Sequence, residues 1–377
     1  MKASASAKNG LKIGLLGSGQ LARMLALQAH AMGLVPYVYG GSSDDPAAQV
    51  TAFYTPGDLK DPKKLEEFLR KVDIATFESE FMDGALLKAL SEKTQTPIYP
   101  KPEVMERLQD RLSQKTLLEK NKLPSSPFLK VSTLPELEAA QKKFAKTGFV
   151  LKKRKFGYDG YGTFLVRNTK ELENVKTLLE KTPEGFIAEA FVKFKRELAI
   201  SAVRNKKGEV AFLPLVESFQ KDSRCFWVKG PVTHPKLNAL KTKIKKFLNS
   251  IDYVGIIAFE LFDAKSLLIN EIAPRVHNSA HYSLDGLNKD QFELHLEAIL
   301  NRKLKDPTPI NKAFAMVNLL GSHNNPPQWT ELSQGRMHWY GKKENRPGRK
   351  MGHINFISTS PAKALETALK TLKEIDL

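Results

Sequence analysis

Apolar and polar positions follow a regular order over the first hundred residues. The stretch 11–33 starts with a short apolar run, breaks at Gly17-Ser18-Gly19, and resumes with apolar residues at helical spacing. Residues 35–40 and 72–80 have the pattern of further strands, and residues 61–72 predict a helix. This alternation of strand and helix predicts an α/β domain built on a parallel sheet.

The pattern changes beyond Pro100 and Pro102. We expect one helix between these breakers and Pro124, followed by helices mixed with hairpin-like strands, which indicates an α+β region. A polar, proline-containing break at 305–309 precedes a last region with short strands and one closing helix. The sequence therefore predicts four segments: a loose tail (1–10), a Rossmann-like domain (11–114), an α+β domain (115–304) and a small C-terminal domain (305–377).

Composition places the chain among ordinary globular proteins. Its 377 residues are 41% hydrophobic and 27% charged, which argues against disorder or a fibrous repeat. Cys225 is the only cysteine, which excludes an internal disulfide and a cysteine-cluster metal site and suits a reducing compartment. The opening MKASASAKNG lacks the apolar stretch of a secretory signal, and no apolar run is long enough for a membrane span. We therefore expect a cytoplasmic protein.

The formal charge of +18 is the unusual bulk property. Such a charge suits nucleic acid, a membrane surface or small anionic ligands. The lysines are spread along the chain at spacings that place them on solvated helix faces, and no zinc-finger or aromatic-basic repeat accompanies them. A generally basic surface is therefore favoured, and we expect neither a nucleic acid nor a membrane as partner.

The segment GSGQLA follows a predicted strand and opens a predicted helix. It matches G-x-G-x-x-A, in which glycines let a phosphate approach a helix N-terminus. A nicotinamide cofactor is one interpretation; a turn that only packs strand on helix, or a site for another ligand's phosphate, are the others. Asp44 and Asp45 lie somewhat past the usual distance for a ribose-binding acid.

The segment TFESE places Glu78 and Glu80 at the end of a predicted strand. Because side chains alternate along a strand, both carboxylates are expected on one side, at the sheet edge where α/β proteins bind ligands. Solvated acids at a strand end are the alternative interpretation.

Residues 152–164, KKRKFGYDGYGTF, join four basic side chains to a glycine-rich loop. The exposed N–H groups of GYDGYG can fold over a polyphosphate, and Lys152, Lys153, Arg154 and Lys155 can offset its charge. The loop is not a Walker A loop, because no Gly-Lys-Ser/Thr follows it, and a mobile hairpin with solvated lysines is the alternative. If Lys152 lies on a strand, alternation turns only one of Lys152 and Lys153 inward.

The segment VGIIAFELFDAKSLLINEI predicts a hairpin with two apolar strands. Its geometry is expected to place Glu260 opposite Ile269, with Glu271 as the diagonal neighbour on the same face. Two carboxylates in an apolar hairpin repel each other unless a cation lies between them, and oxygen ligands completed by phosphate oxygens suit Mg²⁺. A pair of surface acids is the alternative.

A polar loop, APRVHNSAHYSLDG, follows this hairpin. Arg275 can bind a carboxylate or phosphate in bidentate fashion. His277, Asn278 and His281 can act as acid, base or hydrogen-bond donor, and their crowding predicts a site rather than a core segment.

Seven motifs, in order, resemble one family across nearly the whole chain. They are GLLGSGQLARML, TFESE, QDRLSQK, FGYDGYGTF, NEIAPRVHNSAHYSLDG, DQFELHLEAI and RPGRKMGHIN. This order resembles the 5-(carboxyamino)imidazole ribonucleotide synthases of purine biosynthesis, which are ATP-grasp enzymes. The resemblance implies an ATP-grasp fold over 115–304, ATP and Mg²⁺ as cofactors, bicarbonate as co-substrate, and a homodimer.

The same resemblance implies roles for individual residues, motif by motif. ATP is expected to contact Arg111, Lys152, Gly157, Tyr158, Asp159, Gly160, Tyr161, Gly162, Thr163, Glu189, Ala190, Phe191, Val192, Glu197, Gln220, Asn270 and Glu271. The implied metal ligands are Glu260 and Glu271. The ribonucleotide is expected at Gln20, Leu21, Glu78, Glu80, Tyr158, Asp159, Arg275, His277, Asn278, Lys342, Lys343 and Arg349. The chain departs from the family's motifs at Ala22, Tyr161, Gln220 and Ala280.

The implied reaction is the carboxylation of 5-aminoimidazole ribonucleotide by ATP and bicarbonate through carboxyphosphate. Lys152, Asp159, Arg275 and His277 are the implied catalytic residues, and we hypothesise that Asp159 and His277 orient the amine and handle its proton. Another ATP-grasp ligase, such as a formate-dependent glycinamide ribonucleotide transformylase or a carboxylase subunit, is the close alternative. A nicotinamide oxidoreductase is the more distant one.

Overall fold

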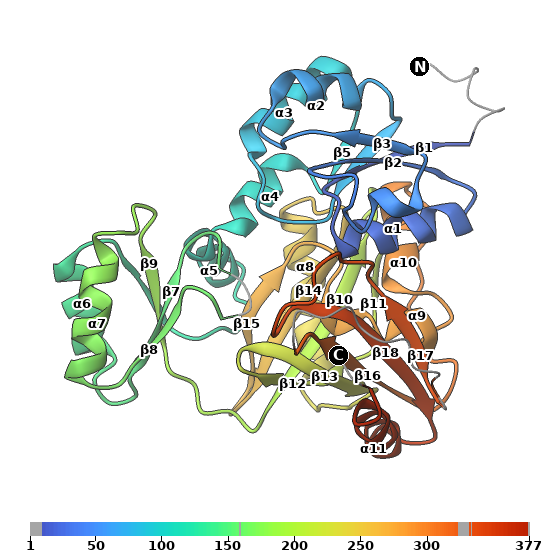
Figure 1. Cartoon of the computed structure of the whole chain (residues 1–377). Coiled ribbons are helices and arrows are strands. Elements are labelled where there is room, and N and C mark those ends of the chain that lie inside the picture. The colour runs from blue at the N-terminus through green and yellow to red at the C-terminus, as the bar shows by residue number, and fades with distance from the viewer. Residues whose placement is uncertain (1–9, 158–159, 323–331, 333, 376–377) are drawn as a thin grey trace.

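The structure is a computed structural model and describes residues 10–157, 160–322, 332 and 334–375. It contains three sheets: a parallel sheet near the N-terminus, a small antiparallel sheet in a projecting lobe, and a large antiparallel sheet that forms the body (Figure 1). The described helices include none that is long and apolar enough to cross a membrane.

The first sheet has five parallel strands in the order β3-β2-β1-β4-β5, which confirms the predicted α/β domain. Its strands are β1 (Lys12–Leu16), β2 (Val35–Gly40), β3 (Phe53–Pro56), β4 (Ile74–Phe77) and β5 (Ile98–Tyr99). Its helices are α1 (Gln20–Ala31), α2 (Pro62–Leu69) and α3 (Gly84–Thr94), with a 3₁₀ turn at Ala48–Val50. The strand predicted for residues 72–80 is shorter in the structure, where β4 spans Ile74–Phe77.

The linker to the next domain is two helices, and the prediction of one was wrong. The helices are α4 (Pro102–Gln109) and α5 (Arg111–Lys120). Asp110 separates them because its backbone is extended and its side chain accepts hydrogen bonds from the N–H groups of Leu112 and Ser113, an N-cap arrangement. As a result α5 begins at Arg111, with Lys115 one turn later on the same face.

The small sheet has four antiparallel strands in the order β6-β9-β7-β8. They are β6 (Phe128–Val131), β7 (Phe149–Lys153), β8 (Thr163–Val166) and β9 (Phe186–Ala190), and α6 (Leu134–Lys143) and α7 (Thr169–Leu179) cover one face (Figure 1). This lobe has a hydrophobic core of its own, centred on residues such as Leu137, Leu151 and Phe186.

The large sheet contains nine antiparallel strands, with β15-β14-β10-β12-β13-β16-β18-β17 in order and β11 beside β10. The strands are β10 (Arg196–Arg204), β11 (Val210–Phe212), β12 (Val216–Lys221), β13 (Arg224–Gly230), β14 (Gly255–Asp263), β15 (Leu267–Ala273), β16 (Ala313–Leu320), β17 (Arg336–Trp339) and β18 (Lys350–Ser358). The accompanying helices are α8 (Leu237–Ser250), α9 (Ser283–Gly286), α10 (Gln291–Ile299) and α11 (Pro361–Leu372), with a 3₁₀ turn at Asn278–Ala280.

The C-terminal region is continuous with the large sheet. β16 pairs with β13 from Trp227↔Val317 to Gly230↔Phe314, so the strands after residue 305 extend the sheet that precedes them. One hydrophobic core also runs from α1 and β1 to β10, α10 and β16. This core contains residues from before position 115 and from after position 305, so the predicted domain boundaries do not divide it. The boundaries stay a prediction.

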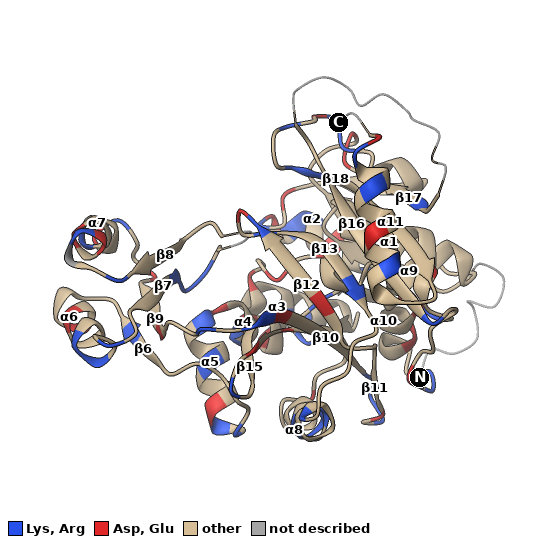
Figure 2. Ribbon diagram, turned by 90° about the horizontal axis from the view of Figure 1, so that it is seen from below, with Lys and Arg blue, Asp and Glu red and all other residues tan. Residues whose placement is uncertain are grey.

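Basic residues are distributed over the whole molecule. In Figure 2, lysines and arginines lie on α6 and α7 of the small lobe, on α5 and around β18. This distribution agrees with the generally basic surface expected from the sequence.

His295 joins the first sheet to the large one. Its Nδ1 accepts a hydrogen bond from the Ile256 N–H (3.1 Å), so the proton lies on Nε2, which contacts Thr76 Oγ1 at 2.7 Å. Burial lowers the pKa of His295 to about 4. Because the unfolded chain takes up this proton near pH 6.5, the native state loses stability as pH falls from 6.5 towards 4.

We expect about 3 kcal/mol of unfolding free energy from His295 to disappear between pH 7 and pH 4. Urea titrations at both pH values check this, with His295→Gln as the comparison. The glutamine variant keeps a donor and an acceptor group but does not titrate. Its unfolding free energy should therefore fall by about 3 kcal/mol less than that of wild type between pH 7 and pH 4. Equal losses in the two proteins would contradict the assignment.

Candidate active site

The predicted pair of hairpin carboxylates lies on β14 and β15. Glu260 stands directly opposite Glu271, whereas Leu261 pairs with Ile269. The predicted register, with Glu260 opposite Ile269 and Glu271 diagonal, was wrong by two residues. The turn is one residue shorter than predicted, because Asp263 already pairs with Leu267, and a β-bulge at Asn270 adds the second residue. The bulge brings the two carboxylates closer in register than the sequence indicated.

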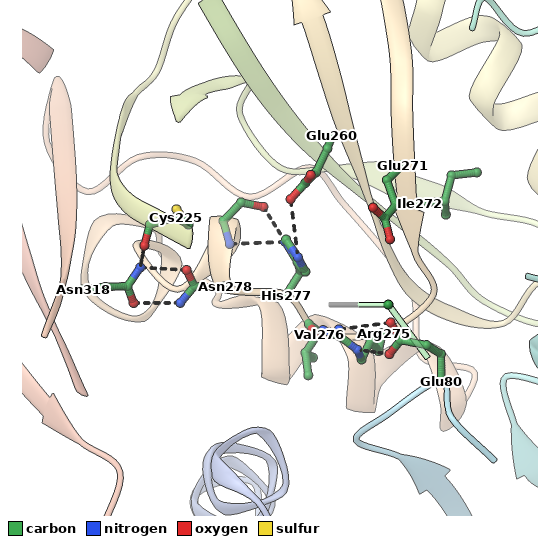
Figure 3. A network of polar contacts seen from close by, with 12 residues as sticks. Glu80, Cys225, Glu260, Glu271, Ile272, Arg275, Val276, His277, Asn278 and Asn318 are labelled. Atoms are coloured by element: carbon green, nitrogen blue, oxygen red, sulfur yellow. Dashed lines mark hydrogen bonds and ion pairs between the residues drawn. The ribbon is translucent and has the colours of Figure 1, made fainter. Parts of the chain in front are cut away.

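Burial and charge act strongly on Glu260. Burial, together with the negative charges of Glu271 and Glu197, raises the pKa of Glu260 to about 7. The His277 ring lies beside it, with Nε2 at 3.7 Å from Glu260 Oε1 (Figure 3). Such a pair of facing carboxylates is stabilised by a cation.

Lys152 enters the same region from β7 of the small lobe. Its Nζ donates to Asn270 Oδ1 at 2.9 Å and lies 3.1 Å from Glu189 Oε1 on β9. Lys153, the next residue, points the other way and lies over the Tyr161 ring at 5.1 Å. The prediction that only one of the two lysines faces inward is confirmed.

Arg111 connects α5 to the hairpin and to the glycine loop. Its guanidinium binds Glu271 Oε1 at 2.7 Å and the carbonyl groups of Lys153 and Gly157 at 3.2 and 3.4 Å. A Cβ at Gly157 would lie 2.4 Å from Arg111 Nη1, so a larger residue there would displace the guanidinium. Gly160 and Gly162 have φ of +81° and +77°, a backbone conformation that favours glycine.

Three of the four basic residues before the loop contact different groups. Arg154 forms an ion pair with Asp110, with Nε at 3.1 Å from Oδ1. Lys153 lies over Tyr161, and Lys152 reaches the hairpin at Asn270. Tyr158 and Asp159, both predicted site residues, lie outside the described residues.

Arg275, His277 and Asn278 lie on the loop after β15, on the same side as Glu260 (Figure 3). The Arg275 guanidinium forms a bidentate ion pair with Glu80, with NH2 at 3.2 Å from Oε1. Burial raises the pKa of Glu80, but the Arg275 charge outweighs it, and the net pKa is lowered. Burial, and then the charges of Arg275 and Lys350, hold the pKa of His277 well below its usual value, so its ring is neutral at pH 7.

Asn278 is held by a reciprocal pair of amide hydrogen bonds. Asn278 Nδ2 donates to Asn318 Oδ1 at 2.9 Å, and Asn318 Nδ2 donates to Asn278 Oδ1 at 2.8 Å (Figure 3). Asn318 is fully buried on β16 and also donates to the Cys225 carbonyl. The C-terminal strands therefore fix the orientation of a predicted site residue.

The helix N-terminus at GSGQLA is occupied by the chain's own carboxylate. Glu78 accepts hydrogen bonds from the N–H groups of Gly19 (2.7 Å) and Ala22 (3.1 Å), the position that a dinucleotide phosphate takes in this motif. Asp45 binds Ser18 and Asp44 binds Lys343. The nicotinamide interpretation was wrong for this physical reason.

Glu78 and Glu80 do not act as a pair. Glu78 caps α1 and Glu80 binds Arg275, because the strand alternation assumed for them ends at Phe77. A cavity of about 650 Å³ opens beside Glu78. Its lining residues are Gly17, Ser18, Gly40, Gly41, Pro56, Gly57, Asp58, Leu59, Lys64 and Glu78. Gln20 and Leu21 form the first turn of α1 beside it.

The predicted phosphate ligands Lys342, Lys343 and Arg349 lie on the loop between β17 and β18. Each contacts a different group: Lys342 the Lys350 carbonyl (2.6 Å), Lys343 the Asp44 carboxylate (2.9 Å) and Arg349 the Glu344 carbonyl (2.9 Å). The loop therefore contacts the first domain through Lys343 and Asp44. Gln49 of that domain also donates a hydrogen bond to the Gly341 carbonyl.

The remaining predicted ATP contacts lie on the small lobe, on the large sheet and on the hinge segment 189–192 that joins them. Ala190 and Phe191 donate their N–H groups to the carbonyls of Pro127 and Gly148. Glu197 lies on β10, where burial raises its pKa although it accepts the backbone N–H of Gln220. Thr163 begins β8, and Val192 follows β9.

Sequence reasoning missed Lys115, Asn318 and Lys350. Lys115 is buried beside Glu189, and Lys350 acts electrostatically on Glu260 and His277. The helical spacing of Arg111 and Lys115 was a usable signal for Lys115. Asn318 lies in an apolar strand segment, AFAMVNLL, where a lone asparagine indicates a buried hydrogen-bond partner.

Comparisons with known proteins agree with this architecture. A family model of the ATP-grasp domain matches residues 116–292, one of the ribonucleotide synthetase preATP-grasp domain matches 11–109, and one of the phosphoribosylaminoimidazole carboxylase C-terminal domain matches 315–367. The fold and these matches define an ATP-grasp ligase.

Individual relatives narrow this class. The N5-carboxyaminoimidazole ribonucleotide synthase of Synechococcus elongatus is 35% identical over 96% of this chain and 95% of its own. The solved N5-carboxyaminoimidazole synthetase of Staphylococcus aureus, complexed with ADP, is 29% identical with a TM-score of 0.89, covering 98% of this chain and 99% of that one. The Aspergillus clavatus synthase with ADP and 5-aminoimidazole ribonucleotide is 26% identical with a TM-score of 0.84, covering 97% and 100%. The chain belongs to the N5-carboxyaminoimidazole ribonucleotide synthase family.

Proposed function

We propose that the protein carboxylates 5-aminoimidazole ribonucleotide to N5-carboxyaminoimidazole ribonucleotide, using ATP and bicarbonate and releasing ADP and phosphate. The observation that carries this proposal is the convergence of two groups on one hairpin. Arg111 contacts Glu271 and Lys152 contacts Asn270, whereas His277, from the loop that also carries Arg275 and Asn278, lies beside Glu260. Membership of the family supports the same reaction.

The chain's own donors suit Mg²⁺ carried by a polyphosphate. Among the described residues, no group of three or more His, Cys, Asp and Glu side chains is placed to hold a metal ion. Glu260 and Glu271 would supply two carboxylate ligands to Mg²⁺. Because two ligands do not fill its coordination shell, phosphate oxygens are expected to complete it. Bound there, Mg²⁺ would neutralise charge on the transferring phosphoryl group.

In the proposed ATP half, Lys152 and Arg111 bind the phosphates and the glycine loop covers them. Because Ala190 and Phe191 already donate their N–H groups, we assign adenine recognition to the hinge carbonyls and the next amide, that of Val192. Bicarbonate oxygen attacks the γ-phosphorus, the bond to ADP breaks, and carboxyphosphate results. Lys152 stabilises the charge that develops on the phosphoryl oxygens.

In the proposed acceptor half, carboxyphosphate releases CO₂ and phosphate inside the closed site. The exocyclic amine of the ribonucleotide then attacks the CO₂ carbon and loses a proton. We propose that Asp159 and His277 together orient the amine and handle its proton; His277 lies 3.7 Å from Glu260. Lys342, Lys343 and Arg349 are proposed for the 5′-phosphate, because they lie on one loop and carry positive charge.

The resemblance extends the proposal to a homodimer in the cytoplasm, with domains divided near residues 115 and 305. Sedimentation equilibrium tests the assembly state. A mass equal to one chain at micromolar concentration would contradict the dimer.

Phosphate release from ATP, Mg²⁺ and bicarbonate, measured with and without 5-aminoimidazole ribonucleotide, tests the reaction. Release should require the ribonucleotide and match carboxylated product formed. ATP cleavage that ignores the ribonucleotide but responds to formate and glycinamide ribonucleotide would instead support the transformylase alternative.

A further inference from the structure

A buried ammonium group lies behind the ATP-facing lysine. Lys115 on α5 is 2% exposed, and its Nζ lies 2.8 Å from Glu189 Oε2. It also donates to Ser126 Oγ (3.1 Å) and to the Ile269 carbonyl (3.3 Å). Lys115 therefore has a complete set of partners at the junction of α5, the small lobe and the hairpin.

Glu189 lies between two lysines, but the two contacts differ. Its Oε2 accepts a hydrogen bond from Ser126 at 2.6 Å and faces Lys115, whereas Oε1 has no hydrogen-bond donor among the described residues. Lys152 Nζ lies 3.1 Å from Oε1, yet it directs a hydrogen bond to Asn270. Lys115 and Ser126 therefore supply the hydrogen bonds to this carboxylate, and Lys152 acts on it through its charge.

The charges of this cluster add to a positive value. Two ammonium groups and one carboxylate, +2 and −1, leave +1. Without Lys115, the carboxylate of Glu189 and the ammonium of Lys152 would form a closed pair of net charge zero. Burial raises the pKa of Glu189, but the charges of Lys152 and Lys115 outweigh it and lower the pKa to about 2, so the carboxylate is ionised at neutral pH.

We propose that Lys115 is a positioning residue for nucleotide binding: it neutralises Glu189 and so leaves the charge of Lys152 available to the polyphosphate. This inference rests on the proposed function, in which Lys152 binds ATP phosphates. Arg111 lies one turn before Lys115 on α5 and is itself paired with Glu271, so it does not replace the missing charge.

The test is the affinity for ADP of wild type, Lys115→Met and the double variant Lys115→Met/Glu189→Gln, measured by calorimetry. Lys115→Met should weaken ADP binding about tenfold or more, the effect of losing one charge-assisted interaction. Because Glu189 is itself a predicted ATP contact, the double variant is compared with Glu189→Gln alone. The double variant keeps a net charge of +1, and its ADP affinity should lie within about fivefold of that of Glu189→Gln. The KM for the ribonucleotide should change less than twofold in either variant.

Lys120→Met is the matched control, because Lys120 lies on the same helix and is exposed. A purely structural role for Lys115 predicts that the double variant binds ADP as poorly as the single one, which would overturn the inference. If Lys115→Met does not fold, the comparison of the double variant with Glu189→Gln is sufficient. A folded double variant whose ADP affinity is more than tenfold below that of Glu189→Gln overturns the inference. Wild type that fails to bind ADP contradicts the proposed function as well, whereas unchanged affinity in a folded Lys115→Met overturns this inference only.

Discussion

Replacing Lys152 with methionine is expected to lower ribonucleotide-dependent phosphate release by a factor of about 10² to 10³. The side chain is 9% exposed, and its ammonium lies at the meeting point of Asn270 and Glu189. Methionine keeps most of the volume and removes the charge that would stabilise the transferring phosphoryl group. Initial rates at saturating ATP, ribonucleotide and bicarbonate measure this effect.

Lys153→Met is the matched control, because Lys153 is the next residue on β7 and lies over Tyr161 on the opposite face. Its rate should stay within about twofold of wild type, a change near the size of one weak surface interaction. Equal losses in the two variants would mean that general charge near the loop matters and that Lys152 has no specific role.

The sequence predicted those features that depend on neighbouring residues. The parallel α/β domain, the hairpin of β14 and β15 and the inward orientation of Lys152 all follow from periodicity within short segments. Glu260 and Glu271 belong to this group, because both lie in one short hairpin, residues 260–271, which brings them together with little freedom.

Other features depend on single residues that periodicity does not reveal. The bulge at Asn270 changes the register of the hairpin by one residue, and Asp110 interrupts what looks like one continuous helix. In both cases a local side-chain or backbone arrangement overrides a regular pattern.

Contacts between distant segments were out of reach for a different reason. Lys115 meets Glu189, and Glu80 meets Arg275, only because three sheets pack around one region. The contact between Glu78 and the Gly19 N–H is another contact between distant segments. It changes the interpretation of GSGQLA, which matched a dinucleotide-binding motif. Sequence alone gives the residues of such contacts but not their partners.

Replacing Arg275 with methionine is expected to reduce both stability and ribonucleotide use. The Arg275–Glu80 pair is largely buried, with side chains 20% and 13% exposed, so the variant leaves the Glu80 carboxylate without its counter-charge. Breaking such a pair from one side costs about 3 kcal/mol of unfolding free energy. Urea unfolding of the variant measures the loss, and the ribonucleotide KM should rise while the KM for ATP stays close to wild type.

The double variant Glu80→Gln/Arg275→Met separates the two effects. Removing both charges leaves no uncompensated ion, so its stability should exceed that of Arg275→Met, while its ribonucleotide KM stays high. Arg70→Met serves as the control, because the Arg70–Glu66 pair on α2 is a surface ion pair and its loss should leave unfolding unchanged within error. A double variant as unstable as Arg275→Met would show that Arg275 stabilises the fold through packing, whereas recovery of ribonucleotide KM would remove Arg275 from the proposed acceptor site.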